Sequence, residues 1–222
     1  MYRLVRISLQ NWYLVDALDI EIRGSAALIG PTGAGKSSIQ DAIQTIIAGN
    51  NANRIHLNPS ASGKSRRTVR DYCLGYVEDP SEGGKPKRSA CETVIALTFE
   101  HEETARRIAI GLAMTAWANE TREETISRFV ADGYSYSVED AVVEADGERR
   151  LMKWADIRSG MAAKAVSFEE FKSAERFTAG FLQIMRGRHS VPDIRHFLRA
   201  FGHALAFKPI YDPTEYVRSY VL

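Results

Sequence analysis

The chain has 222 residues, of which 45% are hydrophobic and 26% are charged, and its formal net charge is +1. These values are typical of a globular protein with one sizeable domain or two small ones. The near-zero net charge excludes a generally basic protein, so any DNA contact requires a local patch. The chain has no run of about eighteen apolar residues and no leader pattern, so we expect a cytoplasmic protein with no membrane partner.

Two strands are expected at the start of the chain. Residues 2–9 and residues 15–22 both alternate between more and less apolar side chains. Asn11-Trp12-Tyr13 interrupts the first alternation, and Arg23-Gly24-Ser25 turns the chain after the second. The pattern predicts an antiparallel pair of strands ahead of the first glycine-rich loop. A small-molecule kinase usually begins almost directly with its phosphate-binding strand. Two strands ahead of the loop therefore indicate a different class of P-loop protein.

Residues 30–37 read Gly-Pro-Thr-Gly-Ala-Gly-Lys-Ser and match G-x-x-x-x-G-K-[ST], the phosphate-binding P-loop. The flanking sequence fits this interpretation, because Ala26–Ile29 is expected to be a short buried strand. Ser37–Ala48 has the apolar spacing of a helix, and Gly49 and Asn50 are stop signals. A strand, a glycine-rich loop and a helix therefore occur in the required order.

The residue types of the loop suit a nucleotide. Gly30, Gly33 and Gly35 lack side-chain bulk, so the backbone can wrap a triphosphate and adopt positive φ angles. Lys36 can reach the β- and γ-phosphates, and the Ser37 hydroxyl can join the shell of a Mg²⁺ ion. We therefore expect ATP and Mg²⁺ as cofactors. The expected nucleotide-binding residues are Gly30, Pro31, Thr32, Gly33, Ala34, Gly35, Lys36, Ser37 and Ser38, with Ser37 as the metal ligand.

Residues 50–71 are polar and basic. This segment is either a solvated loop or a surface beside the nucleotide that contacts DNA or a partner, since guanidinium groups suit phosphates. The candidate contacts are Arg54, Arg66 and Arg67. Residues 78–89 contain prolines and glycines and are expected to form an exposed loop.

The middle of the chain is β-rich. Two β-prone runs, 92–99 and 107–114, flank a polar turn and predict a hairpin, and 125–130 is expected to add a third strand. Residues 141–144 give a weaker fourth strand. This region shows no catalytic constellation, and we expect an antiparallel subdomain.

Helical spacing begins at Ser167. Ser167-Phe168-Glu169-Glu170 has the pattern of a capping box, and the apolar positions continue to about Met185. Ser190 and Asp193 predict the start of another helix through about Ala204. A last helix is expected from Asp212, and it has no stop signal, which suggests that the natural chain continues.

Several parts of a complete ATPase are not evident. Hydrolysis needs a carboxylate on a buried strand to hold the Mg²⁺ shell, and the closest sequence, Val94–Glu100, lacks the Asp-Glu pair. No Leu-Ser-Gly-Gly signature occurs, so no catalytic residue is assigned. Cys73 and Cys91 are expected to be reduced thiols, and the histidines do not form a zinc pattern.

The succession of strand, Asn-Trp turn, strand and P-loop, followed by Asp41-Ala42-Ile43, resembles the N-terminal half of SMC, Rad50 and RecF-type ATPase heads. Residues 37–51, 57–65 and 212–222 resemble, more narrowly, the JetC family, the SMC-like subunits of the Wadjet antiplasmid system, related to the MukB and MksB condensins. Such heads carry a glutamine before the coiled coil, whereas residues 207–210 contain none and Gln183 lies elsewhere, so that contact is not assigned.

The resemblance implies an α/β P-loop fold of the ABC/SMC-head type, with a mixed sheet, an antiparallel β-subdomain and a helical lobe. It divides the chain into a P-loop core (1–75), a β-rich subdomain (76–165) and a helical lobe (166–222) that leads to a coiled coil. It also implies that ATP hydrolysis drives DNA loop extrusion in a nucleoid-associated, condensin-like complex. The implied partners are the C-terminal half of the same head, a second head in a homodimer, DNA, and kleisin-type and accessory subunits.

Two other functions remain open from the sequence. A self-contained small-molecule or nucleotide kinase would transfer phosphate with these residues alone. A non-enzymatic module would bind DNA through the Arg54–Arg70 stretch, with an affinity that falls steeply with salt and ignores ATP.

Overall fold

The computed structural model describes residues 1–57, 67–145, 147–186 and 193–205. Its centre is a six-stranded sheet in the order β2-β1-β3-β4-β5-β8, in which every pair of neighbours is antiparallel. The strands are β1 (Tyr2–Trp12), β2 (Val15–Glu21), β3 (Ala90–His101), β4 (Arg107–Trp117), β5 (Glu124–Asp132) and β8 (Ser167–Glu170).

The central strands have near-continuous apolar sequences. β3 and β4 pair without a break from Ala90 opposite Trp117 to Glu100 opposite Arg107. Successive residues face opposite sides of the sheet, and here both sides are covered over the middle of these strands. A Cβ on Gly111 would lie 2.5 Å from the carbonyl oxygen of Ile95 and 2.5 Å from the ring of Phe129. The missing side chain at this position therefore makes room for the aromatic ring of β5.

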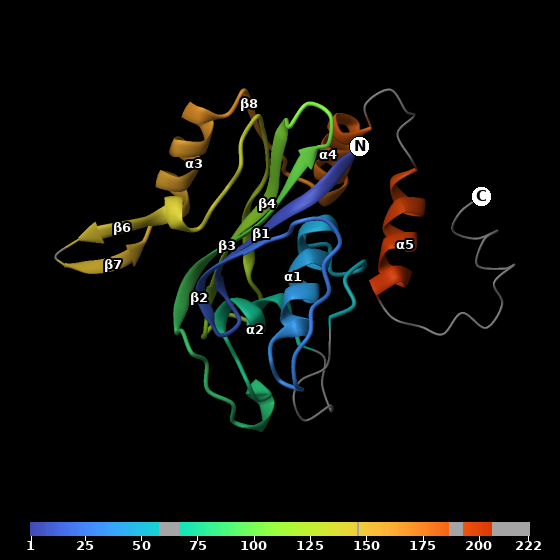
Figure 1. Ribbon diagram of the computed structural model, residues 1–222. Coiled ribbons are helices and arrows are strands. Elements are labelled where there is room, and N and C mark those ends of the chain that lie inside the picture. Colours follow the sequence, from blue (N-terminus) through green and yellow to red (C-terminus); the bar gives the residue numbers. More distant parts are fainter. Residues whose placement is uncertain (58–66, 146, 187–192, 206–222) are drawn as a thin grey trace, which may run out of the picture.

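Four helices lie on one side of the sheet, which we call the helical face; three of them contact its strands, and the last one packs mainly on two of the other helices (Figure 1). They are α1 (Lys36–Ile47), α2 (Val69–Leu74), α4 (Ala174–Met185) and α5 (Ile194–Leu205). Their apolar side chains form the larger core with those of the strands, including Ile46, Leu97 and Leu112. α1 contacts β1, β3 and β4, so the sheet supports the helix that follows the P-loop.

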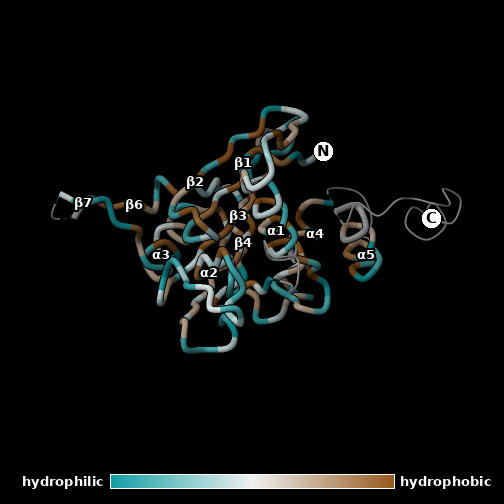
Figure 2. The backbone as a smooth tube through the Cα atoms, turned by 90° about the horizontal axis from the view of Figure 1, so that it is seen from below, coloured by the Kyte–Doolittle hydropathy of each residue, from teal (hydrophilic) through white to brown (hydrophobic). Residues whose placement is uncertain are grey.

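The opposite face, which we call the outer face, is covered only in part. α3 (Trp154–Lys164) and the loop around Tyr136 pack on it and form a second core with Phe129. The hairpin of β6 (Val142–Ala145) and β7 (Glu148–Leu151) extends away from the sheet on this side (Figure 1). In Figure 2, hydrophobic stretches gather around β3, β4 and α1, whereas β7 is hydrophilic.

Two expectations from the sequence are wrong for this sheet. The expected mixed sheet is wrong, because all its pairs among the described residues are antiparallel. Ser167–Glu170 does not begin a helix but forms β8, whose pairing with β5 outweighs the local capping pattern. The helix begins instead at Ala174, where the Ser173 side chain accepts a hydrogen bond from the Arg176 amide.

Other elements agree with expectation or add to it. The antiparallel pair at the start, the helix after the P-loop and the strands β3, β4 and β5 are confirmed. Residues 141–144 contribute to a strand, but it pairs with β7 in the separate hairpin. The helices α2 and α3 and the short 3-10 helix Pro80–Glu82 were not expected. Asp193 caps α5 as predicted, whereas Ser190 and the helix expected from Asp212 lie outside the described residues.

The three expected parts of the chain share one sheet. β1 and β2 come from residues 1–75, β3 to β5 from residues 76–165, and β8 from residues 166–222. The larger core likewise draws on all three. In the described part of the chain, no helix has both the length and the apolarity needed to span a membrane.

Candidate nucleotide-binding site

The segment that leads into the P-loop is not a strand. Ala26–Ile29 has no regular secondary structure, and Leu28 and Ile29 are 42% and 91% exposed. The expected buried strand is therefore wrong. The physical reason is that no described strand lies beside it to pair with its amides and carbonyls, and a single strand gains no ladder hydrogen bonds.

The loop itself has the backbone that the motif predicts. Gly33 and Gly35 have φ angles of 84° and 85°, in the left-handed region that favours glycine. Gly30 differs from expectation, since its φ is not positive; a Cβ there would lie 3.2 Å from that of Ala34. The loop tightens at a turn in which the Ala34 amide donates to the Pro31 carbonyl over 3.2 Å.

Lys36 lies across this loop. Its ammonium nitrogen donates to the carbonyl oxygens of Gly30 at 2.7 Å and Pro31 at 2.8 Å. The cation is thus held at the centre of the loop by two backbone oxygens, which are neutral acceptors. A phosphate oxygen would be a stronger, charged acceptor for the same ammonium group.

The start of α1 is open to an anion. Gly35 is its N-cap and provides no side-chain cap, and the first turn has no acidic residue. The Ile39 amide donates to the Gly35 carbonyl, so the amides of Lys36, Ser37 and Ser38 precede the first helical hydrogen bond. Uncapped amides and the positive end of the helix dipole attract phosphate groups.

The remaining residues of the motif divide between solvent and core. Pro31, Thr32, Ala34 and Ser37 are exposed, so their backbone and the Ser37 hydroxyl are accessible. Ser38 is buried, and its carbonyl accepts a hydrogen bond from the Trp12 indole at 2.8 Å. The position of Ser37 in the first turn fits a Mg²⁺ ligand, since a hydroxyl is one of the oxygen donors that the ion accepts.

A buried polar network joins α1 to α2 and β1, and the sequence analysis did not predict it. The Tyr72 hydroxyl of α2 donates to the Asp41 carboxylate of α1, and both residues are 0% exposed. The Tyr72 ring stacks on Trp12 with centroids 4.7 Å apart. Burial, followed by the nearby Asp41 charge, raises the pKa of Tyr72 far above its usual value, so the hydroxyl remains a donor. A carboxylate on the apolar side of α1 was the available signal.

The candidate arginines are engaged by other protein groups. Arg54 forms an ion pair with Glu175 of α4 at 3.3 Å. The Arg67 guanidinium lies 4.6 Å from the centre of the Tyr13 ring and donates to the Tyr13 hydroxyl at 3.0 Å. Arg66 lies outside the described residues.

The described residues do not complete a hydrolytic site. Within them, no group of three or more His, Cys, Asp or Glu side chains is placed to hold a metal ion. Glu100, the nearest sequence match to a Walker B carboxylate, is on β3 and pairs with Arg3 and Arg107. The site as described can hold phosphate groups.

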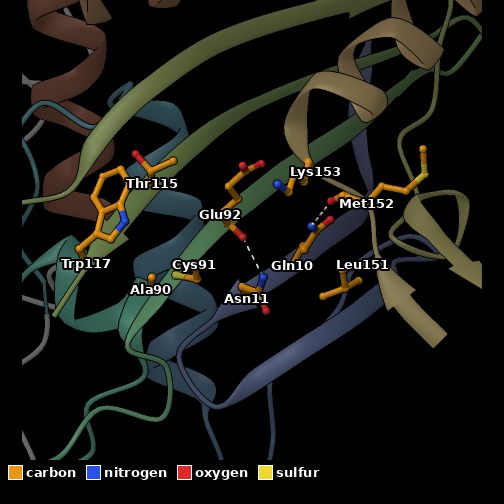
Figure 3. A pocket seen from close by; sticks show the side chains of 10 residues that line it. All are labelled: Gln10, Asn11, Ala90, Cys91, Glu92, Thr115, Trp117, Leu151, Met152 and Lys153. Atoms are coloured by element: carbon orange, nitrogen blue, oxygen red, sulfur yellow. Dashed lines mark hydrogen bonds between the residues drawn. The ribbon is translucent and has the colours of Figure 1, made fainter. Parts of the chain in front are cut away.

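A separate pocket of about 320 Å³ lies on the outer face (Figure 3). Gln10 donates to the Met152 carbonyl at 3.1 Å, and Asn11 donates to the Glu92 carbonyl at 2.8 Å. The Gln10 contact fastens the connection between β7 and α3 to the sheet, and the Asn11 contact joins β1 to β3. Cys91 also lines the pocket; its thiol donates to the Cys73 carbonyl at 3.1 Å, and both cysteines are free.

Comparison with known proteins matches the first part of the chain. The family described as the P-loop containing region of AAA domain matches residues 4–64. Comparison with curated proteins found no match. The family match spans β1, β2, the P-loop and α1, the elements that form the site described above. It supports a P-loop ATPase-type domain with an α/β fold, and hence nucleotide binding.

Proposed function

We propose that this chain is the Mg-ATP-binding N-terminal half of an SMC-like ATPase head. The observation that carries the proposal is a P-loop with suitable backbone and lysine geometry whose lead-in, Ala26–Ile29, is exposed and unpaired. A nucleotide-binding loop normally follows a strand inside a sheet. The segment with the exposed Leu28 and Ile29 is therefore where we expect a strand from another segment to pair.

The proposed roles follow from the geometry. The amides of residues 32, 33 and 35–38 bind the phosphate oxygens, because Pro31 has no amide hydrogen and the Ala34 amide donates to the Pro31 carbonyl. The Lys36 ammonium exchanges its two carbonyl acceptors for the β- and γ-phosphates. Ser37 is the protein ligand of Mg²⁺, which when bound neutralises phosphate charge. The C-terminal half of the head would then supply the acidic metal partner and the strand beside Ala26–Ile29.

The wider function is proposed from the resemblance. Two such heads enclose ATP between them, and their cycle of association and hydrolysis moves DNA by loop extrusion in a condensin-like, antiplasmid complex. Kleisin-type and accessory subunits would complete it. The chain alone should bind ATP with little turnover.

Nucleotide binding is tested with Lys36→Ala. We expect at least a tenfold loss of Mg-ATP affinity in isothermal titration calorimetry, because a charge-assisted hydrogen bond is removed. Lys164→Ala removes the same charge from the exposed end of α3 and is the matched control. Equal affinities of Lys36→Ala and the unaltered chain would refute the site.

The half-head assignment is tested by co-purification with a C-terminal half-head fragment encoded downstream. Ile29→Asp should abolish the complex, because it places a charge in the proposed sheet contact. Val166→Asp alters another exposed apolar side chain and should leave the complex intact. Equal recovery with both variants would refute the docking of a strand at Ala26–Ile29.

A further inference from the structure

The uncovered end of the outer face carries a set of arginines. Arg3 lies opposite Glu100 of β3, which lies opposite Arg107 of β4. A register shift between Leu4 and Arg6 brings Arg6 to the same face as Arg3, where it contacts Ser135 and Tyr136 of the covering loop. In Figure 1 this is the end of the sheet at which the chain begins.

These side chains line a pocket of about 550 Å³. Its charged residues are Arg3, Arg6, Arg23, Arg107, Glu21 and Glu100. Four cations face two anions, so the lining has an excess of two positive charges. The pocket lies on the face opposite α1, and it is therefore separate from the nucleotide site.

The two carboxylates hold the guanidinium groups in place. Glu100 pairs with Arg107 at 2.9 Å and with Arg3 at 3.1 Å, and these arginines lower its pKa. Glu21 pairs with Arg6 at 3.3 Å and with Arg23 at 3.6 Å. Each carboxylate thus bridges two cations, which keeps four guanidinium groups together that would otherwise repel one another.

Two buried polar atoms beside the pocket have no partner in the described part of the chain. Arg6 Nε and Thr98 Oγ1 belong to residues directly paired across β1 and β3, and both atoms are buried without a hydrogen-bond partner among the described residues. A buried donor without an acceptor costs free energy. Both atoms are shielded from solvent, so the guanidinium groups of this pocket that a ligand can reach are those of Arg3, Arg23 and Arg107.

We propose that this arginine pocket binds the phosphate backbone of a nucleic acid. Guanidinium groups match phosphate oxygens with paired donors. Arg3 and Arg107 are half-exposed and Arg23 is exposed, which suits a ligand that lies across the surface better than an enclosed small anion. The charged residues come from β1, β3, β4, the end of β2 and the turn that follows β2. Contacts of this kind with the phosphate backbone position DNA without reading its sequence. The identity of the polyanion as DNA rests on the proposed function, whereas the site itself does not involve the P-loop.

The test measures binding of a short fluorescein-labelled DNA duplex by fluorescence anisotropy, without ATP. The double variant Arg3→Gln/Arg107→Gln should bind about tenfold or more weakly, and the slope of log affinity against log salt should fall by about two. Arg149→Gln/Arg150→Gln removes the same charge from the hairpin and should change affinity less than about twofold. Thermal melting of each variant checks folding, and the single variant Arg23→Gln keeps the test usable if the double variant unfolds.

Three results would overturn the proposal. They are no DNA binding by the unaltered chain, equal losses in the pocket and hairpin variants, and binding of inorganic pyrophosphate that depends on Arg3 and Arg107 and is as tight as DNA binding. The last result would assign the pocket to a small phosphorylated compound. Loss of ATP binding in Lys36→Ala is measured separately, so failure of the nucleotide site and failure of this pocket are distinguishable.

Discussion

Two apolar stretches of similar composition behave differently in this chain. Val94-Ile95-Ala96-Leu97 lies in β3 between β1 and β4, and its residues are at most 1% exposed. Ala26-Ala27-Leu28-Ile29 precedes the P-loop, has no regular structure and is exposed. The difference shows that β-propensity and apolar side chains do not suffice to form a strand. A strand also needs a neighbouring strand for its backbone hydrogen bonds. Of these two segments, only β3 has such neighbours among the described residues.

The largest expected effect tests this contrast with one substitution at two leucines. Leu97→Ala should lower the free energy of unfolding by about 3 kcal/mol, because it opens a cavity in the main core. Leu28→Ala should change it by less than about 0.5 kcal/mol, since the side chain is already partly in water. Urea unfolding measures both values. Similar losses for the two variants would mean that Leu28 is buried in solution.

The next effect concerns the support beneath the P-loop helix. Tyr72→Phe removes a donor to the buried Asp41 carboxylate and should cost about 2 kcal/mol in urea unfolding. Tyr13→Phe is the control, because its hydroxyl accepts from Arg67 at a partly exposed position and should cost less than about 1 kcal/mol. A larger loss in the control would place the main support in the Arg67 contact.

Alkaline pH is expected to lower the stability of the protein through the buried Cys73 thiol. Burial raises the pKa of the Cys73 thiol, so above about pH 9 the unfolded state loses this proton while the folded state keeps it. The unfolded state then binds fewer protons, and the free energy of unfolding falls, by up to about 1.4 kcal/mol per pH unit for one group. Urea unfolding between about pH 8 and 10 should show this decline. Cys73→Ala should make it shallower, and an unchanged slope would contradict the assignment.

The smallest effect is expected at Arg54. Its ion pair with Glu175 is at the surface, and such pairs contribute about 0.5 kcal/mol or less. Arg54→Ala should therefore lower the free energy of unfolding by no more than about that amount. A loss above about 1 kcal/mol, measured in the same way, would show that this pair is essential for holding α4 near α1.

Local patterns predicted much of the fold. The two β-prone runs at 92–99 and 107–114 predicted the β3–β4 hairpin, and Gly49 and Asn50, with φ angles of 63° and 54°, ended α1 as expected. α3 also had a readable signal, since its buried residues Trp154, Ile157 and Met161 are spaced as on one side of a helix. Ser167–Glu170 misled because its capping pattern is local, whereas its pairing with β5 is not.

The loop of the candidate site was predictable from its motif, whereas the contacts that support it were not. The positive φ angles of Gly33 and Gly35 follow from the motif, because a loop that wraps phosphate requires them. The contact of Tyr72 with Asp41, thirty-one positions apart in the chain, depends on how α2 packs against α1, and no local spacing encodes it. The same holds for Ala26–Ile29, since no local pattern shows that this segment lacks a paired neighbour among the described residues.

The attachments of α1 determine where the molecule can change shape. Its C-terminal end is fixed by Arg128 Nε, which donates to the Gly49 carbonyl at 2.6 Å, and by the Thr178 hydroxyl, which donates to the Ile47 carbonyl at 3.3 Å. Its first turn is fixed to β1 through Trp12. A helix anchored at both ends is a stationary platform, so we expect any adjustment to a bound nucleotide in residues 26–35, which precede the helix and form neither helix nor strand.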